Sequence, residues 1–195
     1  IAAGAALHYL AETQHHQVKH IANLHRIEEE HHVWMDRFTI RNLELYQANS
    51  QHAVTLLDVI DKTISPMGGR MLKRWLALPL KNTEKIAQRH QVVNHFMKNH
   101  AFQQGIQQQI KKIGDLERMV TKVSTSRISP RELVQLKNSI KVVDEIKLIS
   151  QKIKLSDSFK SLIDDLEDGK DIILLIESQI NEDAPVSLNK GNVIK

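Results

Sequence analysis

Two adjacent glycines followed by basic residues are the first feature of this sequence that could hold a phosphate. They lie in the stretch SPMGGRMLKRWLALPL, residues 65–80. A nucleotide loop of the Walker type requires GxxxxGK followed by Ser or Thr, because its backbone amides and its lysine together surround the phosphates. Here an arginine follows Gly69, and at the single Gly-Lys pair, Gly169-Lys170, an aspartate follows the lysine. Neither stretch predicts a nucleotide site.

The same stretch is typical of the start of an amphipathic helix. Ser65 suits the N-cap and Pro66 suits the first helical position. The Gly68-Gly69 pair costs roughly 1 kcal/mol per glycine relative to alanine, which predicts that another segment approaches the first turn closely. Basic residues occupy the outer face of this helix, where they could neutralise the phosphates of a DNA backbone. These candidate DNA contacts are Arg70, Lys73 and Arg74.

A group of charged residues further along superficially resembles a catalytic carboxylate pair. Asp115 and Glu117 are two positions apart, so a helix would point them to different sides. Arg118 lies about one turn from Asp115 and could pair with it. We therefore interpret this group as structural, and we predict no catalytic residue in the chain.

The histidines are the candidate metal ligands. All 11 fall within the first 100 residues, and seven lie between His8 and His32. His16 and His20 would share one helix face, a spacing that could bind zinc. The sequence contains no HExxH, no cysteine and no obvious third ligand, so we interpret these residues as ordinary exposed histidines and predict no metal site. A His-based metal-binding helical bundle is the least favoured alternative.

The composition favours a helical protein without disulfides. The 195 residues include no cysteine, four prolines and seven glycines, and residues that favour helix dominate the rest. No apolar run reaches the roughly 18 residues that a membrane span needs. Residues 62–131 carry 14 Lys and Arg against three acids, a balance of +11, whereas the remainder carries −7. A basic centre between acidic flanks suits a surface that faces phosphate or an acidic partner.

Apolar periodicity predicts an all-α, multihelical packed domain with one short extended element. One long helix is expected over residues 1–30. The β-branched and aromatic residues of 33–45 favour an extended or strand element. A helical subdomain is expected over 52–125, and a long helix with further helices over 129–180.

The long helix after residue 128 has the clearest start signal. Ser129 is a capping residue, Pro130 occupies the first helical position, and Glu132 follows the cap by three positions, which together predict a capping box. Behind this start, apolar residues recur at helical spacing and predict one buried stripe. The stripe consists of Leu133, Leu136, Ile140, Val143, Ile146, Ile149 and Ile153.

Several motifs taken together resemble the core domain of the MutS mismatch-repair family. The stretch 61–80 closely resembles a signature of that domain, and TIRNLEL at 39–45 resembles the extended element before it. Downstream, IGDLER at 113–118 and SPREL at 129–133 follow in the family's order. The resemblance spans about residues 7–150, and the remaining residues fit by position rather than by motif.

This resemblance implies that the chain is the first part of the core, or lever, domain, between the connector and the inserted clamp. It carries neither the family's Phe-x-Glu mismatch-reading motif nor its Walker motifs, so we expect a chain that is not an enzyme and holds no cofactor. ATP and Mg²⁺ would belong to another domain of the parent protein. The implied role is mechanical: the chain links connector, clamp and ATPase domains and transmits nucleotide state to the DNA grip.

The resemblance also implies partners and a location. The partners would be other domains of the same protein, mismatched double-stranded DNA, a second copy in a homodimer, and a MutL-like protein. The location would be the bacterial cytoplasm, associated with the nucleoid and without a membrane. Because the chain begins with Ile1, we expect both of its ends to be boundaries within a longer protein. A freestanding helical interaction module is the main alternative.

The same resemblance assigns a structural or interdomain role to residues of these motifs. Those near residue 40 could form a hinge, an interdomain contact or a local salt-bridged turn. The full set is Asp36, Arg41, Asn42, Glu44, Ser65, Pro66, Gly68, Gly69, Trp75, Asp115, Arg118, Ser129, Pro130 and Glu132.

Overall fold

The structure, a computed structural model, describes residues 1–13, 31–50, 52–186, 189 and 191–195. Helices dominate these residues, and the only strand pairing among them consists of two isolated antiparallel bridges, His32 with Leu80 and Ile180 with Ile194. The prediction of an all-α, multihelical domain is confirmed. In the described part of the chain, no helix is both long enough and apolar enough to cross a membrane.

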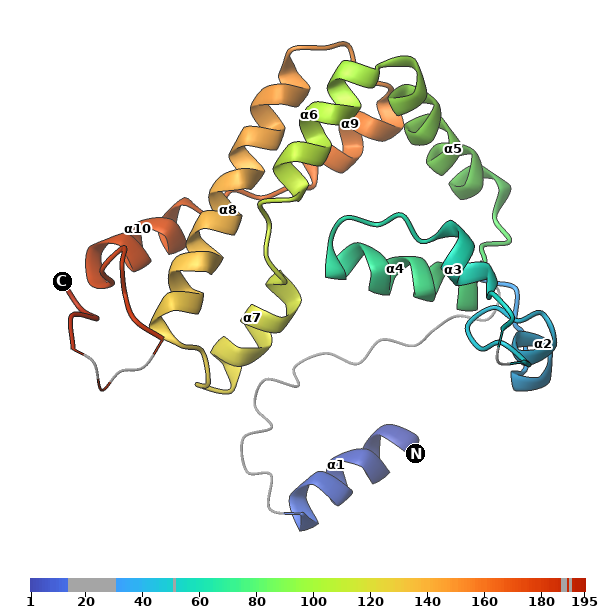
Figure 1. The fold of residues 1–195 in the computed structure, drawn as a ribbon, viewed down its shortest axis with the longest axis horizontal. Helices are drawn as coiled ribbons and strands as arrows, with labels where there is room; N and C mark the ends of the chain where they lie inside the picture. The colour runs from blue at the N-terminus through green and yellow to red at the C-terminus, as the bar shows by residue number, and fades with distance from the viewer. Residues whose placement is uncertain (14–30, 51, 187–188, 190) are drawn as a thin grey trace.

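The helices of the described residues are shown in Figure 1. In chain order they are α1 (Ala2–Glu12), α2 (Arg37–Asn42), α3 (Leu56–Ile60), α4 (Pro66–Ala77), α5 (Thr83–Lys98), α6 (His100–Ile110), α7 (Leu116–Ser124), α8 (Pro130–Gln151), α9 (Asp157–Asp164) and α10 (Lys170–Gln179).

The main hydrophobic core lies where α5, α6, α8 and α9 meet. Its buried residues are Phe102, Ile106, Val142, Ile146 and Phe159. On both α6 and α8 the buried pair is four positions apart, which places each pair on one helix face. The ring of Phe159 lies 5.0 Å from that of Phe96 and 5.5 Å from that of Phe102 between centroids. Aromatic packing therefore joins α9 to α5 and α6, which lie more than 40 residues earlier in the chain.

The helices form two limbs that diverge from this core (Figure 1). The α8 limb consists of α8 with α7 and α10 near its far end. The α5 limb consists of α5 and the residues 31–80 that precede it, which include α2, α3 and α4. Within the α5 limb, α4 extends toward the α8 limb, with its N-terminal end toward α7. Helix α1 lies apart from the other helices, and none of its residues is buried.

The buried residues of α8 do not follow the one stripe predicted from its sequence, because five of the seven stripe residues are only half-buried. Leu136 and Ile146 of the stripe are buried, but so are Val134 and Val142 outside it. The reason is that α6, α7 and α10 all pack against α8, so several of its faces are covered. Its most buried side chains are polar, namely Lys137, Ser139 and Ser150.

The extended element predicted at 33–45 is largely helical instead. Residues 33–36 are extended, but Arg37–Asn42 form α2. Asp36 caps this helix, because its Oδ1 accepts a hydrogen bond of 2.6 Å from the backbone N–H of Thr39. A strong N-cap outweighs the β-propensity of Thr39 and Ile40, which is a weak and context-dependent preference.

Other predicted boundaries also moved. The first helix of the subdomain expected over 52–125 begins at Leu56, because Thr55 caps it with a capping box. Helix α1 covers the first part of the helix predicted over 1–30, and residues 14–30 lie outside the described residues. The predicted start of α8 is confirmed, including Ser129 as its cap and Pro130 at its first position.

Candidate functional site

The glycine pair at the start of α4 lies against the loop that precedes it. A Cβ atom at Gly68 would come within 3.4 Å of Thr63 Cβ, and one at Gly69 within 3.3 Å of Thr63 Oγ1. Ser65 caps the helix by accepting a hydrogen bond from the N–H of Gly68. The predicted close approach is confirmed, and its cause is a side chain of the preceding loop. The glycines fix where α4 begins and so where its next residue, Arg70, points.

Arg70 joins α4 to the start of α7 by three hydrogen bonds. Its Nη1 and Nη2 donate to the two carboxylate oxygens of Asp115 at 2.9 and 2.7 Å, and its Nε donates to Glu117 Oε2 at 2.8 Å. Parallel bonds from a planar guanidinium to a carboxylate are the strongest ion-pair geometry in proteins. The Arg70 guanidinium holds the pKa of Asp115 below its ordinary value. The two carboxylates in turn raise the pKa of Arg70.

This arrangement corrects the expectation that Asp115 and Glu117 point to different sides of a helix. Asp115 is the N-cap of α7 and therefore does not have helical backbone angles. From that position its side chain also accepts a hydrogen bond of 3.2 Å from the N–H of Arg118. Arg118 thus meets Asp115 through its backbone, while the charge partner of Asp115 is Arg70. The expected pairing of Arg118 with Asp115 is therefore replaced by that of Arg70 with Asp115.

The residue before Asp115 is fixed to α8. The N–H of Gly114 donates to Ser139 Oγ at 3.0 Å, and Ser139 is fully buried. A Cβ atom at Gly114 would lie 2.9 Å from Gln135 Nε2 and 3.0 Å from Met119 Cε. Only glycine allows this approach without displacing its neighbours. The carboxylates that receive Arg70 are therefore held on the α8 limb.

A second link between α7 and α8 lies at the capping box of α8. Ser129 and Glu132 satisfy each other's backbone N–H groups, and Glu132 also pairs with Lys122 of α7. The hydrogen bonds from Lys122 and from the Ser129 backbone lower the pKa of Glu132 to about 2. Glu132 therefore stays ionised over the physiological range and keeps both interactions.

The residues near position 40 form a local turn. The N–H of Asn49 donates to Glu44 Oε1 at 2.8 Å, and its Nδ2 donates to the carbonyl of Arg41 at 3.4 Å. Glu44 has a φ of +49°, a conformation that non-glycine residues adopt mainly in tight turns. Asn42 is the last residue of α2. Within this chain, these residues form a local turn. Its hydrogen bonds join side chains to backbone groups and not two opposite charges. A hinge or an interdomain contact stays a prediction.

This turn is connected to α4 and then to α5. Tyr46 Oη donates to the carbonyl of Lys73 at 2.8 Å. Trp75, also on α4, contacts Arg89 of α5. The guanidinium carbon of Arg89 lies 3.7 Å from the centroid of the Trp75 ring, within the range of a cation–π contact. Trp75 thus joins α4 to α5.

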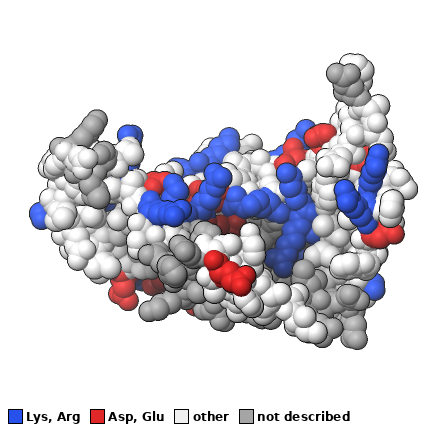
Figure 2. All heavy atoms as spheres, turned by 90° about the horizontal axis from the view of Figure 1, so that it is seen from below, with Lys and Arg blue, Asp and Glu red and all other residues white. Residues whose placement is uncertain are grey.

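The remaining predicted DNA contacts are exposed on α4. Lys73 and Arg74 are both exposed, whereas the guanidinium of Arg70 is bonded to two carboxylates. Figure 2 shows Lys and Arg gathered in an interrupted band across one face of the molecule, with Asp and Glu between them. A face of this kind suits weak contact with a phosphate backbone and does not form an enclosed anion site.

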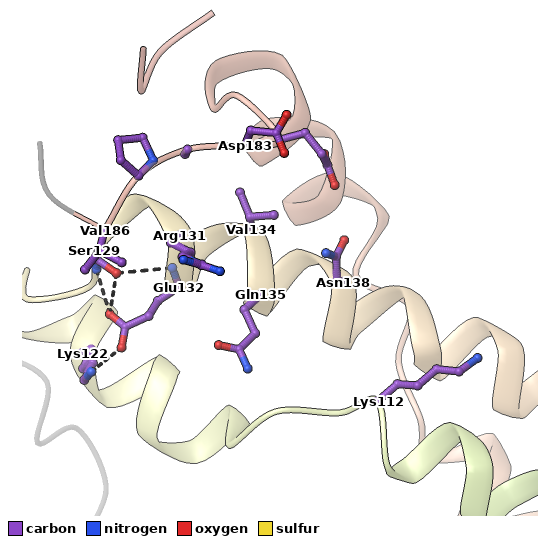
Figure 3. Close-up of a pocket in the computed structure, with 13 residues that line it drawn as sticks. Lys112, Lys122, Ser129, Arg131, Glu132, Val134, Gln135, Asn138, Asp183 and Val186 are labelled. Atoms are coloured by element: carbon purple, nitrogen blue, oxygen red, sulfur yellow. Dashed lines mark hydrogen bonds and ion pairs between the residues drawn. The ribbon is translucent and has the colours of Figure 1, made fainter. Parts of the chain in front are cut away.

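A hollow of about 950 Å³ borders the first turns of α8 (Figure 3). Its lining mixes Lys112 and Arg131 with Glu132 and Asp183. In Figure 3, Asp183 lies on one side of α8, and Gln135 lies on the other. Because the charges are mixed and lie around a helix, the hollow has no convergent set of groups that would hold a small ligand.

The described residues contain no group of three or more His, Asp or Glu side chains that could hold a metal ion. His16 and His20, the candidate zinc pair, lie outside the described residues. Metal binding therefore gains no support from the geometry.

Comparison with known proteins identifies the family behind these motifs. A family model described as MutS domain III matches residues 38–195. The chain belongs to the MutS family. It is 54% identical to the DNA mismatch repair protein MutS of Christiangramia forsetii over 194 residues. The corresponding proteins of Flavobacterium psychrophilum and Bacteroides fragilis are 52% and 45% identical to it.

Each of these three matches covers 100% of this MutS-family chain but only 22% of the relative. The chain therefore spans about a fifth of the length of the curated relatives that it matches. The match to domain III includes α4, α7 and α8, so the ion pairs of Arg70 and Glu132 both lie within the matched residues. The expected identity as a core-domain segment of the family is confirmed.

Sequence reasoning missed the most buried charge in the described part of this MutS domain. Lys137 of α8 has only 2% of its side chain exposed, and its ammonium pairs with Glu182 and lies 4.0 Å from Glu177 Oε1. Glu177 also pairs with Lys141. The only available signal was the position of this lysine between Leu136 and Ile140 of the apolar stripe. Its partner Glu182 lies 45 positions away.

Proposed function

We propose that this chain is a non-catalytic lever segment of a MutS-type mismatch-repair protein. In this proposal it links the connector, clamp and ATPase domains and transmits nucleotide state to the grip on DNA. The parent protein would bind mismatched DNA, and ATP with Mg²⁺, through its other domains. It would act in the bacterial cytoplasm at the nucleoid, as a homodimer with a MutL-like partner.

The observation that carries this proposal is the construction of α8. This helix has 22 residues, which corresponds to about 33 Å. A capping box fixes its start, and α6, α7 and α10 pack along it. A helix that is capped at one end and packed along its length bends little, so it is suited to carry a displacement between distant domains. The identity of those domains is taken from the resemblance to the MutS family and is part of the proposal.

Breaking α8 in the full-length parent protein tests the lever role. Glu145 is exposed near the middle of α8, and proline there would remove a helix hydrogen bond and clash with the preceding turn, at a cost of about 3 kcal/mol. We expect Glu145→Pro to retain mismatched-duplex binding without nucleotide but to slow ATP-induced release about tenfold, a coupling loss typical of linked sites. Stopped-flow release of a labelled duplex would measure it.

The matched control is Glu145→Ala, which removes the same side chain but preserves the helix. It should release DNA at the wild-type rate. Normal ATP-induced release by the proline variant, with its helix content reduced in circular dichroism spectra, would show that α8 does not carry the signal.

We also propose that the α4 face contacts the DNA backbone through Lys73 and Arg74, with Arg70 held by its two carboxylates. The isolated chain should then bind matched and mismatched duplexes equally and weakly, and moderate salt should abolish binding. Changing both residues to glutamine should weaken binding to both duplexes alike and reduce the salt slope by about two. Fluorescence anisotropy titrations over a series of salt concentrations would measure these effects.

A control variant with the same charge change is Lys152→Gln with Lys154→Gln, because both lysines are exposed beyond α8. Equal effects of the two double variants would argue against a specific contact at α4. A mismatch preference that survives moderate salt would contradict the proposal that mismatch reading lies in another domain.

A further inference from the structure

We propose that Arg70 is the key residue of an ionic latch that holds the two limbs of the domain together, and that the latch opens when its charges are screened or removed. The latch consists of Arg70 on one side and of Asp115 and Glu117 on the other. In this interpretation the angle between the limbs is set by these three side chains and is not fixed by packing. The inference goes beyond the proposed lever role, because it names the contact that sets the shape of the lever.

The two sides of the latch are anchored to different limbs. On the α5 limb, Trp75 of α4 contacts Arg89 of α5. The residues between these two helices are tied to the segment before α2, because the N–H of Val33 donates to the carbonyl of Pro79 at 2.7 Å and that of Lys81 donates to the carbonyl of His31 at 3.0 Å. On the α8 limb, Asp115 follows Gly114, which is bonded to buried Ser139. The bonds of Arg70 therefore connect two separately anchored bodies.

Packing between these bodies is slight at this point. Among the described helices, the pairs that pack closely are α5 with α6, α5 with α9, and α8 with α6, α7 and α10. Helix α4 belongs to none of them, and none of its residues is buried. With so little apolar contact to hold α4 beside α7, the hydrogen-bonded charges of Arg70 have a large share in fixing its position.

The exposure of Arg70 and Glu117 makes the latch reversible, although Asp115 is half-buried. Arg70 is 45% exposed, Asp115 18% and Glu117 66%. Exposed ion pairs are weak and are screened by salt, since the Debye length falls from about 10 Å at 0.1 M to about 3 Å at 1 M. A contact of this kind closes and opens within one fold, whereas the aromatic core at the junction of the limbs stays intact.

Distance measurements across the latch would test it. The chain has no cysteine, so the changes Lys62→Cys and Ser124→Cys introduce unique spin-label sites at exposed positions on either side of the latch. Pulsed electron resonance should give one narrow distance population for the otherwise unchanged chain at low salt. Adding Arg70→Gln should broaden it and add a longer-distance population. Raising the salt to 1 M should broaden the distance distribution of the otherwise unchanged chain in the same way. It should leave the distribution of the Arg70→Gln variant unaltered.

Two further variants keep the test decisive. Glu117→Gln removes one carboxylate but retains the Asp115 cap, and it should give an intermediate distribution. Lys122→Gln breaks a neighbouring ion pair within the α8 limb, between α7 and α8, and should leave the distance unchanged. The proposal is overturned if Arg70→Gln, with wild-type helix content, keeps the narrow population at low salt. It is equally overturned if Lys122→Gln broadens the distances as much as Arg70→Gln does.

Discussion

Replacing Phe159 with alanine is expected to lower the free energy of unfolding by about 3–5 kcal/mol, the usual cost of truncating a buried phenylalanine. Only 4% of Phe159 is exposed. Its ring contacts Phe96 and Phe102, and it lies 5.3 Å from the ring of His95 between centroids. Because these rings come from α5 and α6, the change would remove the contact that holds α9 to both helices.

Urea denaturation followed by circular dichroism would measure this loss. Leu162 lies on the same short helix but is 52% exposed, so Leu162→Ala should cost only about 0.5 kcal/mol, as is usual for surface substitutions. Similar losses for the two variants would mean that α9 contributes helix propensity and not a core side chain. A core that depends on Phe159 would also explain how the two limbs keep a common junction.

The sequence was most informative about where helices begin. Ser65 and Ser129 are each expected to cap a helix, and each one accepts a hydrogen bond from the N–H three residues later. Capping depends on residues that are adjacent in the chain, so local chemistry is sufficient to predict it. The same signal is present at Asp36, which caps α2 although β-branched residues follow it.

Contacts between distant segments could not be predicted in this way. Arg70 was expected on a free basic face, yet its partners lie 45 and 47 positions later. The prediction of one buried stripe on α8 was also incomplete. The apolar pattern of a single helix does not reveal how many other helices pack against it. Lys137 illustrates the difficulty, since a lysine in a sequence is normally assigned to solvent and is buried only when a specific partner compensates its charge.

The ion pair between Lys137 and Glu182 should also have a large effect on the free energy of unfolding. Changing Glu182 to glutamine is expected to lower the free energy of unfolding by about 3 kcal/mol, because removing one partner leaves a buried charge uncompensated. This is the lower end of the usual range, since Glu182 is 65% exposed and Glu177 remains 4.0 Å from the ammonium. The hydrogen bond from Lys137 lowers the pKa of Glu182. The contribution of the pair should therefore persist at neutral pH and disappear as the pH falls below the ordinary range of glutamate.

The variant Lys137→Met separates the charge from the packing. Methionine fills most of the volume of the lysine but needs no partner, and such replacements are often neutral or stabilising. We therefore expect Lys137→Met to unfold within about 1 kcal/mol of the wild type. Adding Glu182→Gln to it should then cost almost nothing, because no buried ammonium remains to be compensated. If the glutamine still cost about 3 kcal/mol in that background, Glu182 would stabilise the chain through contacts other than Lys137. If Lys137→Met unfolds like the wild type and Glu182→Gln costs nothing in that background, the ion pair adds no net stability. Its role would then be to fix where the segment after α10 lies against α8.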